Sequence, residues 1–166
     1  MSNVRGLVGM LCFLAIAGCS DDDFEPIVQK QSRLLGGGGG NGSKKWVLVS
    51  GAASSINFPS TDLDFETCFS DNVYTFQNNA SQDYNVAEGS SKCSSFDTNT
   101  TEKGSWALTL DGKSIIIHAN EVPSEQYTFG YVQAKIIELT DTSFKISFEG
   151  GSNPPITYTL TFEVMP

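Results

Sequence analysis

Near its C-terminus the chain reads Thr157-Tyr158-Thr159-Leu160-Thr161-Phe162-Glu163-Val164. Apolar or aromatic side chains occupy every second position of this stretch, and threonine or glutamate occupies the positions between them. A period of two places these two sets on opposite faces of an extended chain. The stretch therefore predicts a β-strand with one buried face and one face in water.

The same alternation recurs through the chain from residue 44 onward. The segment 144–149 repeats it, and further strands are predicted over residues 45–50, 72–77, 82–88, 104–110, 113–119 and 127–139. These strands number about eight, and most are joined by short loops. We therefore expect an all-β fold in which an antiparallel up-and-down meander closes into a β-barrel. A β-sandwich of two open sheets is the alternative.

Two local signals refine this prediction. Asp111-Gly112 lies between two predicted strands and favours a two-residue hairpin turn of type I′, in which both central residues have positive φ. Beyond residue 44 we expect at most one short helical turn, within residues 61–69.

The N-terminus has the pattern of a secretory signal. Arg5 is followed by an apolar segment over residues 7–17 and then by Gly18-Cys19. This segment is too short for a membrane span, which needs about 20 apolar residues. Small residues directly before a cysteine resemble the bacterial lipobox. The resemblance implies that residues 1–18 are a lipoprotein signal peptide and that Cys19 is acylated, which anchors the protein without a span. An ordinary signal peptide is the alternative.

Residues 19–43 are expected to join the lipidated Cys19 to the folded domain, which we assign to residues 44–166. The acidic run over residues 20–25 resembles the surface-export signal of lipoproteins in one group of Gram-negative bacteria. Five glycines at 36–40 predict a flexible tether. We expect an outer-membrane, lipid-anchored protein at the cell surface; an anchor facing the periplasm is the alternative.

Composition argues against several classes of function. The formal net charge is −9 with no basic cluster, so nucleic acid is not an expected partner. His118 is the one histidine, and the sequence does not pair it with a nucleophile. Asp62, Asp64 and Glu66 alternate in a loop but lack the order of an EF-hand. We expect no enzyme activity, no catalytic residues, no cofactor and no metal.

The four cysteines have separable roles. Cys12 leaves with the signal peptide and Cys19 carries the lipid. Cys68 and Cys93 then remain in a protein exported from the reducing cytosol, where such a pair most simply forms a disulfide. Closing this loop would stabilise the fold by about 3–4 kcal/mol on the chain-entropy model.

Several motifs, in this order, resemble the bacterial lipocalin-like domain lipoprotein family. They are Lys44-Lys45-Trp46-Val47-Leu48, the stretch from Cys68 to Phe76, Gly104-Ser105-Trp106, and the hairpin from Tyr131 to Ile146. The resemblance extends over residues 34–164. It implies a lipocalin-like barrel, and the family supplies no catalytic residues to carry over.

Aromatic side chains are the candidate ligand-binding residues, because they line a barrel cavity when they point inward and form a binding patch when they point outward. The candidates are Trp46, Phe76, Trp106, Tyr127, Phe129 and Tyr131. Trp46 and Trp106 also fit a purely structural place in the core. The segment 127–131 is the preferred binding rim, because it places three aromatic residues on one face beside a loop.

Two functions follow from these expectations. In the first, the barrel binds a small apolar or amphipathic ligand at the outer membrane. In the second, a filled barrel serves as a structural or interaction subunit of an outer-membrane complex, with a protein as its partner.

Overall fold

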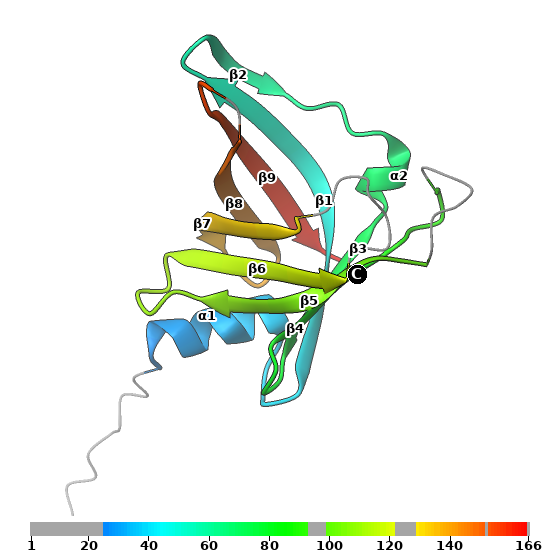
Figure 1. Cartoon of the computed structure of the whole chain (residues 1–166). Helices are drawn as coiled ribbons and strands as arrows, with labels where there is room; N and C mark the ends of the chain where they lie inside the picture. Colours follow the sequence, from blue (N-terminus) through cyan, green and yellow to red (C-terminus); the bar gives the residue numbers. More distant parts are fainter. Residues whose placement is uncertain (1–24, 93–98, 122–128, 152, 166) are drawn as a thin grey trace, which may run out of the picture.

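The computed structural model describes residues 25–92, 99–121, 129–151 and 153–165 (Figure 1). Its elements are α1 (Ile27–Gly36), β1 (Gly42–Ser55), β2 (Phe58–Asp62), α2 (Thr67–Ser70), β3 (Val73–Asn78), β4 (Asp83–Ala87), β5 (Thr100–Leu108), β6 (Ser114–Glu121), β7 (Tyr131–Leu139), β8 (Ser143–Gly150) and β9 (Ile156–Val164). In this described part, no helix has the length and apolar character needed to cross a membrane.

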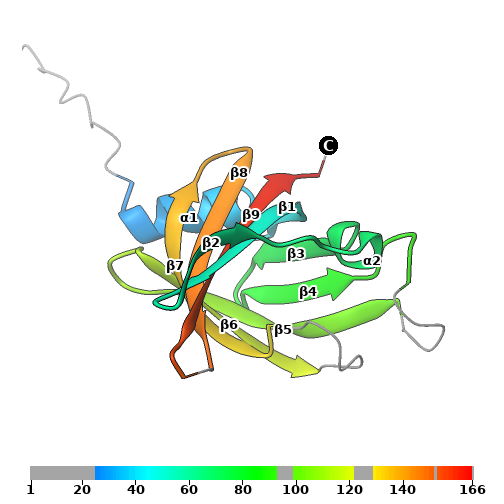
Figure 2. The same cartoon turned by 90° about the horizontal axis from the view of Figure 1, so that it is seen from above.

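The strands form one antiparallel sheet that closes on itself. Their order is β2-β1-β3-β4-β5-β6-β7-β8-β9, and β1 also pairs with β9. This last pairing joins the two ends of the meander, with Trp46 opposite Val164 and Ser54 opposite Thr157. The result is a closed eight-stranded barrel with β2 as an extra strand (Figures 1 and 2). The predicted up-and-down barrel is confirmed, and the sandwich alternative is wrong.

The long strand β1 pairs along the same edge with two different strands, β3 and β2. Its first half pairs with β3 as far as Val47, and its last residues pair with β2. The pairing with β9 shifts between Leu48 and Ser50, so Val49 is the extra residue of a β-bulge. Bulges bend and twist a strand, and this one lies where β1 passes from β3 to β2.

All eight strands expected from the sequence are present, as β1 and β3 to β9. The prediction missed β2 and the second half of β1. All five residues of β2 are exposed, so this strand has no buried face and no apolar alternation to reveal it. The short helix expected within residues 61–69 is α2, which begins at Thr67.

The prediction of a flexible tether up to residue 43 was wrong from Ile27 onward. Residues 27–36 form α1, which packs against β1 and β3. The Leu35 side chain is 0% exposed, and the carbonyl oxygen of Leu35 accepts a 2.9 Å hydrogen bond from the indole Nε1 of Trp46. The glycine run terminates the helix and does not prevent it from forming. Gly37, which follows the last helical residue, has a φ of 85°. The folded body therefore begins before residue 44.

The turn between β5 and β6 also differs from the prediction. Gly112 has a φ of 67°, but Asp111 is not among the described residues with positive φ, so the turn is not type I′. Asp111 Oδ1 instead accepts hydrogen bonds from Thr109 Oγ1 and from the Lys113 backbone N–H, at 2.7 and 3.0 Å. Because this side chain organises the loop, β5 ends at Leu108 and the connection is longer than two residues.

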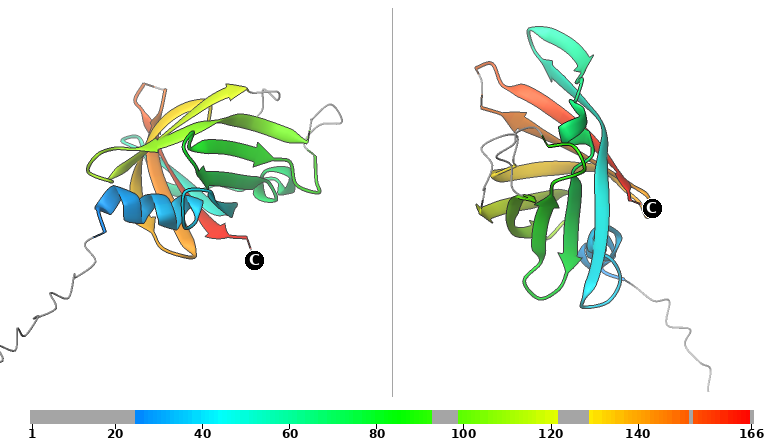
Figure 3. Two further views of the ribbon diagram at one scale, coloured as in Figure 1. Left: turned by 90° about the horizontal axis from the view of Figure 1, so that it is seen from below. Right: turned by 90° about the vertical axis from the view of Figure 1, so that its right-hand side faces the viewer.

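Helix α1 and strand β2 mark opposite ends of the barrel (Figure 3, right). The α1 end is filled by aromatic rings in mutual contact. Phe144 lies 5.8 Å from Trp46 and 5.9 Å from Phe76 between ring centroids, and Phe76 lies 6.0 Å from Trp106. The barrel interior is therefore solid at this end, and any internal site must lie toward the other end.

Candidate functional site

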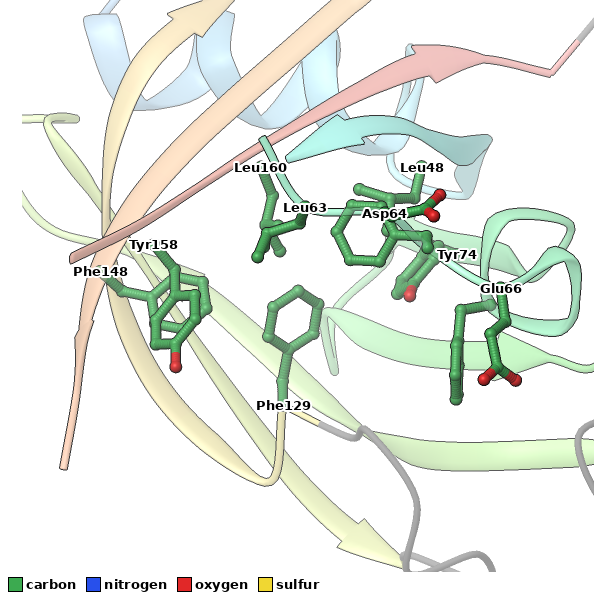
Figure 4. Close-up of a pocket in the computed structure, with 11 residues that line it drawn as sticks. Leu48, Leu63, Asp64, Glu66, Tyr74, Phe129, Phe148, Tyr158 and Leu160 are labelled. Atoms are coloured by element: carbon green, nitrogen blue, oxygen red, sulfur yellow. The ribbon is translucent and has the colours of Figure 1, made fainter. Parts of the chain in front are cut away.

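A cavity of about 430 Å³ occupies the barrel end away from α1 (Figure 4). Residues of β1, β3, β8, β9 and α2 form its walls, together with the loop after β2 and Phe129. The lining residues are Leu48, Leu63, Asp64, Phe65, Glu66, Phe69, Tyr74, Phe129, Phe148, Tyr158 and Leu160. This volume lies within the range of about 300–1,000 Å³ that is usual for small-molecule sites.

Aromatic rings form one continuous wall of this cavity. Phe129 contacts Tyr74 and Phe148 with centroid distances of 6.0 and 6.1 Å, and Phe148 stacks on Tyr158 at 5.6 Å. In Figure 4 the Phe129 ring projects between the two sides of the cavity. The faces of these rings make the wall largely apolar, and the rings restrain one another.

Both carboxylates and one of the two tyrosine hydroxyls lie on one side of the cavity. Figure 4 shows Asp64, Glu66 and Tyr74 together, across from Phe148 and Tyr158. Asp64 and Glu66 are exposed at the mouth, whereas Tyr74 is only 9% exposed. The Tyr74 hydroxyl has no hydrogen-bond partner within the described residues. The cavity thus has one side with two carboxylates and the Tyr74 hydroxyl, and a more apolar side on which Tyr158 carries a hydroxyl.

Glu102 fixes the position of Phe129 from inside the barrel. It shares a face of β5 with Trp106 and is 1% exposed. Its carboxylate accepts hydrogen bonds from the backbone N–H groups of Phe129 and Gly130 at 3.0 and 3.1 Å, and from the Tyr84 hydroxyl at 3.4 Å. These bonds hold the segment that carries the Phe129 ring into the cavity.

Burial also changes the ionisation of the Glu102 carboxyl group. Loss of hydration raises the pKa of Glu102 to about 7 from its ordinary 4.5, although the three hydrogen bonds act in the opposite direction. Burial and, secondarily, the nearby Glu102 charge raise the pKa of Tyr74, so its hydroxyl keeps its proton at neutral pH.

The structure separates the aromatic candidates that the sequence grouped together. Trp46, Phe76 and Trp106 are buried in the core and do not line the cavity, which for Trp46 and Trp106 is the structural place that the sequence also allowed. Among the candidates in the described ranges, Phe129 alone lines it. Tyr127 lies outside the described residues.

Tyr131 does not belong to a binding rim with Phe129. It is 69% exposed on the outer face of β7, where its ring lies 5.9 Å from that of the exposed His118. Gly130 between them has a φ of 56°, which breaks the alternation that the prediction assumed. Phe129 therefore points into the barrel and Tyr131 points out.

Sequence reasoning missed most of the cavity wall and Glu102. The signal for Phe148, Tyr158 and Leu160 was present, because they share the inward faces of their strands with the buried Ile146 and Phe162. Glu102 lies four residues before Trp106 on β5, so the period of two places its charged side chain on the same inward face, and this was a usable signal. Nothing in the sequence distinguished the inward residues that fill the barrel from those that line a cavity.

The remaining predicted site residues are only partly within the described ranges. Cys68 is buried on α2, whereas Cys93 and Cys19 lie outside the described residues, so the disulfide and the lipidation stay predictions. In the described ranges no group of three or more His, Cys, Asp or Glu side chains is arranged to hold a metal ion.

The protein is an eight-stranded antiparallel barrel with one filled end and an apolar cavity at the other. This is the architecture of barrels that hold one small ligand. Residues 43–146 match the family model of the lipocalin-like domain, and the chain belongs to this family. A search of curated proteins gave no match.

Proposed function

We propose that this lipocalin-like barrel binds a small apolar or amphipathic ligand in its open end and acts without catalysis. The observation that supports this is the contrast between the two ends of the barrel. The α1 end is packed with aromatic rings, whereas the other end keeps a cavity of about 430 Å³ with three leucines and six aromatic rings in its wall. Such a surface gains most by burying an apolar molecule.

Binding of Nile red, a neutral apolar dye, tests this proposal. The purified protein should enhance the fluorescence of the dye in a saturable way. Leu160→Trp places a larger side chain in the cavity wall and should weaken binding at least about 10-fold by occupying ligand volume. Ile137→Trp, on the exposed outer face of β7, is the matched control and should bind like the wild type.

Circular dichroism establishes that both variants are folded. Absence of saturable dye binding to the wild-type protein would contradict the proposal. Equal binding by the two tryptophan variants would show that the dye occupies another surface.

We further propose that the barrel is held at the outer membrane, on the cell surface, through a lipid on Cys19. The lipobox-like sequence before Cys19 and the acidic run over residues 20–25 support this location. Metabolic labelling with a fatty acid should mark the protein and should fail for Cys19→Ser. An antibody should stain intact cells; staining only after rupture of the outer membrane would indicate that the barrel faces the periplasm.

The pair Cys68 and Cys93 is proposed to form a disulfide in the exported protein. The intact mass should be two hydrogens below that of the reduced chain, and neither cysteine should react with iodoacetamide before reduction. Labelling of both cysteines in protein from an oxidising compartment would refute the pairing.

A protein-binding role is the second candidate, and the hairpin of β1 and β2 favours it. This hairpin projects at the barrel end away from α1 (Figure 1), and Ile56 at its tip is 89% exposed. A photo-crosslinking residue at position 56 should then give one discrete adduct in the native envelope. A crosslink pattern no different from that at the exposed Leu110 would argue against this role.

A further inference from the structure

We propose that the cavity selects an amphiphile with a protonated amine over one with a carboxylate, and seats the amine beside Asp64, Glu66 and Tyr74. The inference rests on the proposed binding function and specifies the class of ligand. It concerns the polar side of the cavity, whereas the apolar side accepts the body of the ligand.

The charges around the cavity are negative. Asp64 and Glu66 are the charged residues of its wall, and no lysine, arginine or histidine is among the described lining residues. Glu102 adds a third carboxylate behind the wall, close enough to influence the ionisation of Tyr74. A ligand carboxylate would therefore meet repulsion without a compensating cation, whereas an ammonium group would meet attraction.

The Tyr74 hydroxyl is a polar group available to a ligand. Tyr74 is more than nine-tenths buried and lines the cavity, yet its hydroxyl is unpartnered within the described residues. Because the hydroxyl is open to the cavity, a ligand that enters can bond to it without displacing a protein partner. An ammonium group is a suitable partner because it can donate a hydrogen bond to this hydroxyl while the two carboxylates at the mouth attract its charge.

The lining residues place the charged and the apolar parts of the cavity apart from each other. The hydroxyl and both carboxylates lie on one side of the cavity, and Phe148, Tyr158 and Leu160 lie on the other (Figure 4). One ligand can thus place its charged group and its apolar group in matching surroundings. The occupant with the best complementarity is a small amine with an apolar chain or ring system.

Three probes with the same ten-carbon chain length test this inference: decylamine, decanol and decanoic acid. Each displaces Nile red from the purified protein at pH 7.5 and low ionic strength, below the concentration at which it forms micelles. An exposed charge pair changes affinity by a factor of about 2–5. With two carboxylates that attract the amine and repel the acid, decylamine should bind at least about 10-fold more tightly than decanoic acid. Decanol should lie between them, and added salt should reduce the difference.

The double variant Asp64→Asn, Glu66→Gln should bring the amine and the acid to within about 3-fold of each other. The matched control removes two exposed carboxylates far from the cavity, through Asp141→Asn and Glu163→Gln, and should keep the wild-type order. Tyr74→Phe should weaken decylamine and decanol several-fold while Nile red still binds.

The outcomes separate this inference from the function on which it rests. Failure of the wild-type protein to bind Nile red or decanol would refute the binding function itself. Binding of decanol with equal or tighter binding of decanoic acid than of decylamine would overturn the amine selectivity alone. An order of affinities that the double variant leaves unchanged would overturn the role of Asp64 and Glu66.

Discussion

Replacing Glu102 with glutamine should remove a pH dependence of stability that is built into the barrel. The pKa of Glu102 is about 7 in the folded protein, against an ordinary value of 4.5. The folded chain therefore holds a proton between these pH values that the unfolded chain has lost. The stability contributed by this proton is complete below about pH 4.5 and is lost as the pH rises through about 7.

The magnitude follows from the size of this shift. One pKa unit corresponds to about 1.36 kcal/mol, so the full shift is worth about 3 kcal/mol. Between pH 5 and pH 8 the wild-type protein should lose about 2–3 kcal/mol of unfolding free energy through this group. Glutamine has nearly the same shape but does not titrate. The Phe129 and Gly130 N–H groups donate to different oxygens of Glu102, and glutamine keeps one acceptor oxygen, so Glu102→Gln should lower stability at every pH while removing the pH dependence.

Urea unfolding at pH 5 and pH 8, followed by tryptophan fluorescence, measures the difference. Both tryptophans are buried in the core and should report on its exposure. With a slope of about 2 kcal/mol per molar urea, the wild-type midpoint should fall by about 1 M more than that of Glu102→Gln. The exposed Glu163→Gln should behave like the wild type. Parallel pH profiles for wild type and Glu102→Gln, within about 0.5 kcal/mol, would refute the reasoning.

Two further predictions concern stability and use the same unfolding assay. Leu35→Ala should cost about 2–5 kcal/mol, because it leaves a void where α1 closes the barrel, whereas Ile27→Ala on the exposed side of α1 should change stability by less than about 0.5 kcal/mol. A small effect of both would mean that α1 is not part of the core. Gly104→Ala should cost about 1–3 kcal/mol, because its new methyl group would collide with the β6 backbone at a bulge. Gly40→Ala, with open space around it, is the control, and equal effects at the two glycines would contradict the role of the bulge.

The sequence was sufficient to predict the barrel because most strands carry one buried face. The stretches that became β8 and β9 alternate strictly, and that alternation reflects residues such as Phe144 and Phe162 that point into the core. Strand β2 contributes no side chain to the core, so its sequence shows no alternation of apolar and polar residues. Helix α1 was missed because the glycine run dominated the composition of its neighbourhood and concealed Leu34 and Leu35.

The candidate site was harder to predict for a different physical reason. A period of two identifies which side chains point inward but not how far along the barrel axis they lie. That height depends on the register between strands, which bulges such as the one at Val49 shift. Trp46 and Leu48 illustrate this, because they share the inward face of β1 but one fills the core and the other lines the cavity.

The extra strand β2 bears on self-association. It pairs with β1 on one side only, and so leaves an open edge on a fold whose other strands are closed into a ring. Such an edge can recruit a strand from a second molecule. Pro59 lies within β2 and has no N–H to donate, and Asp62 at the end of the strand adds a charge that opposes pairing. The strand therefore extends the rim of the barrel without offering a continuous template for aggregation.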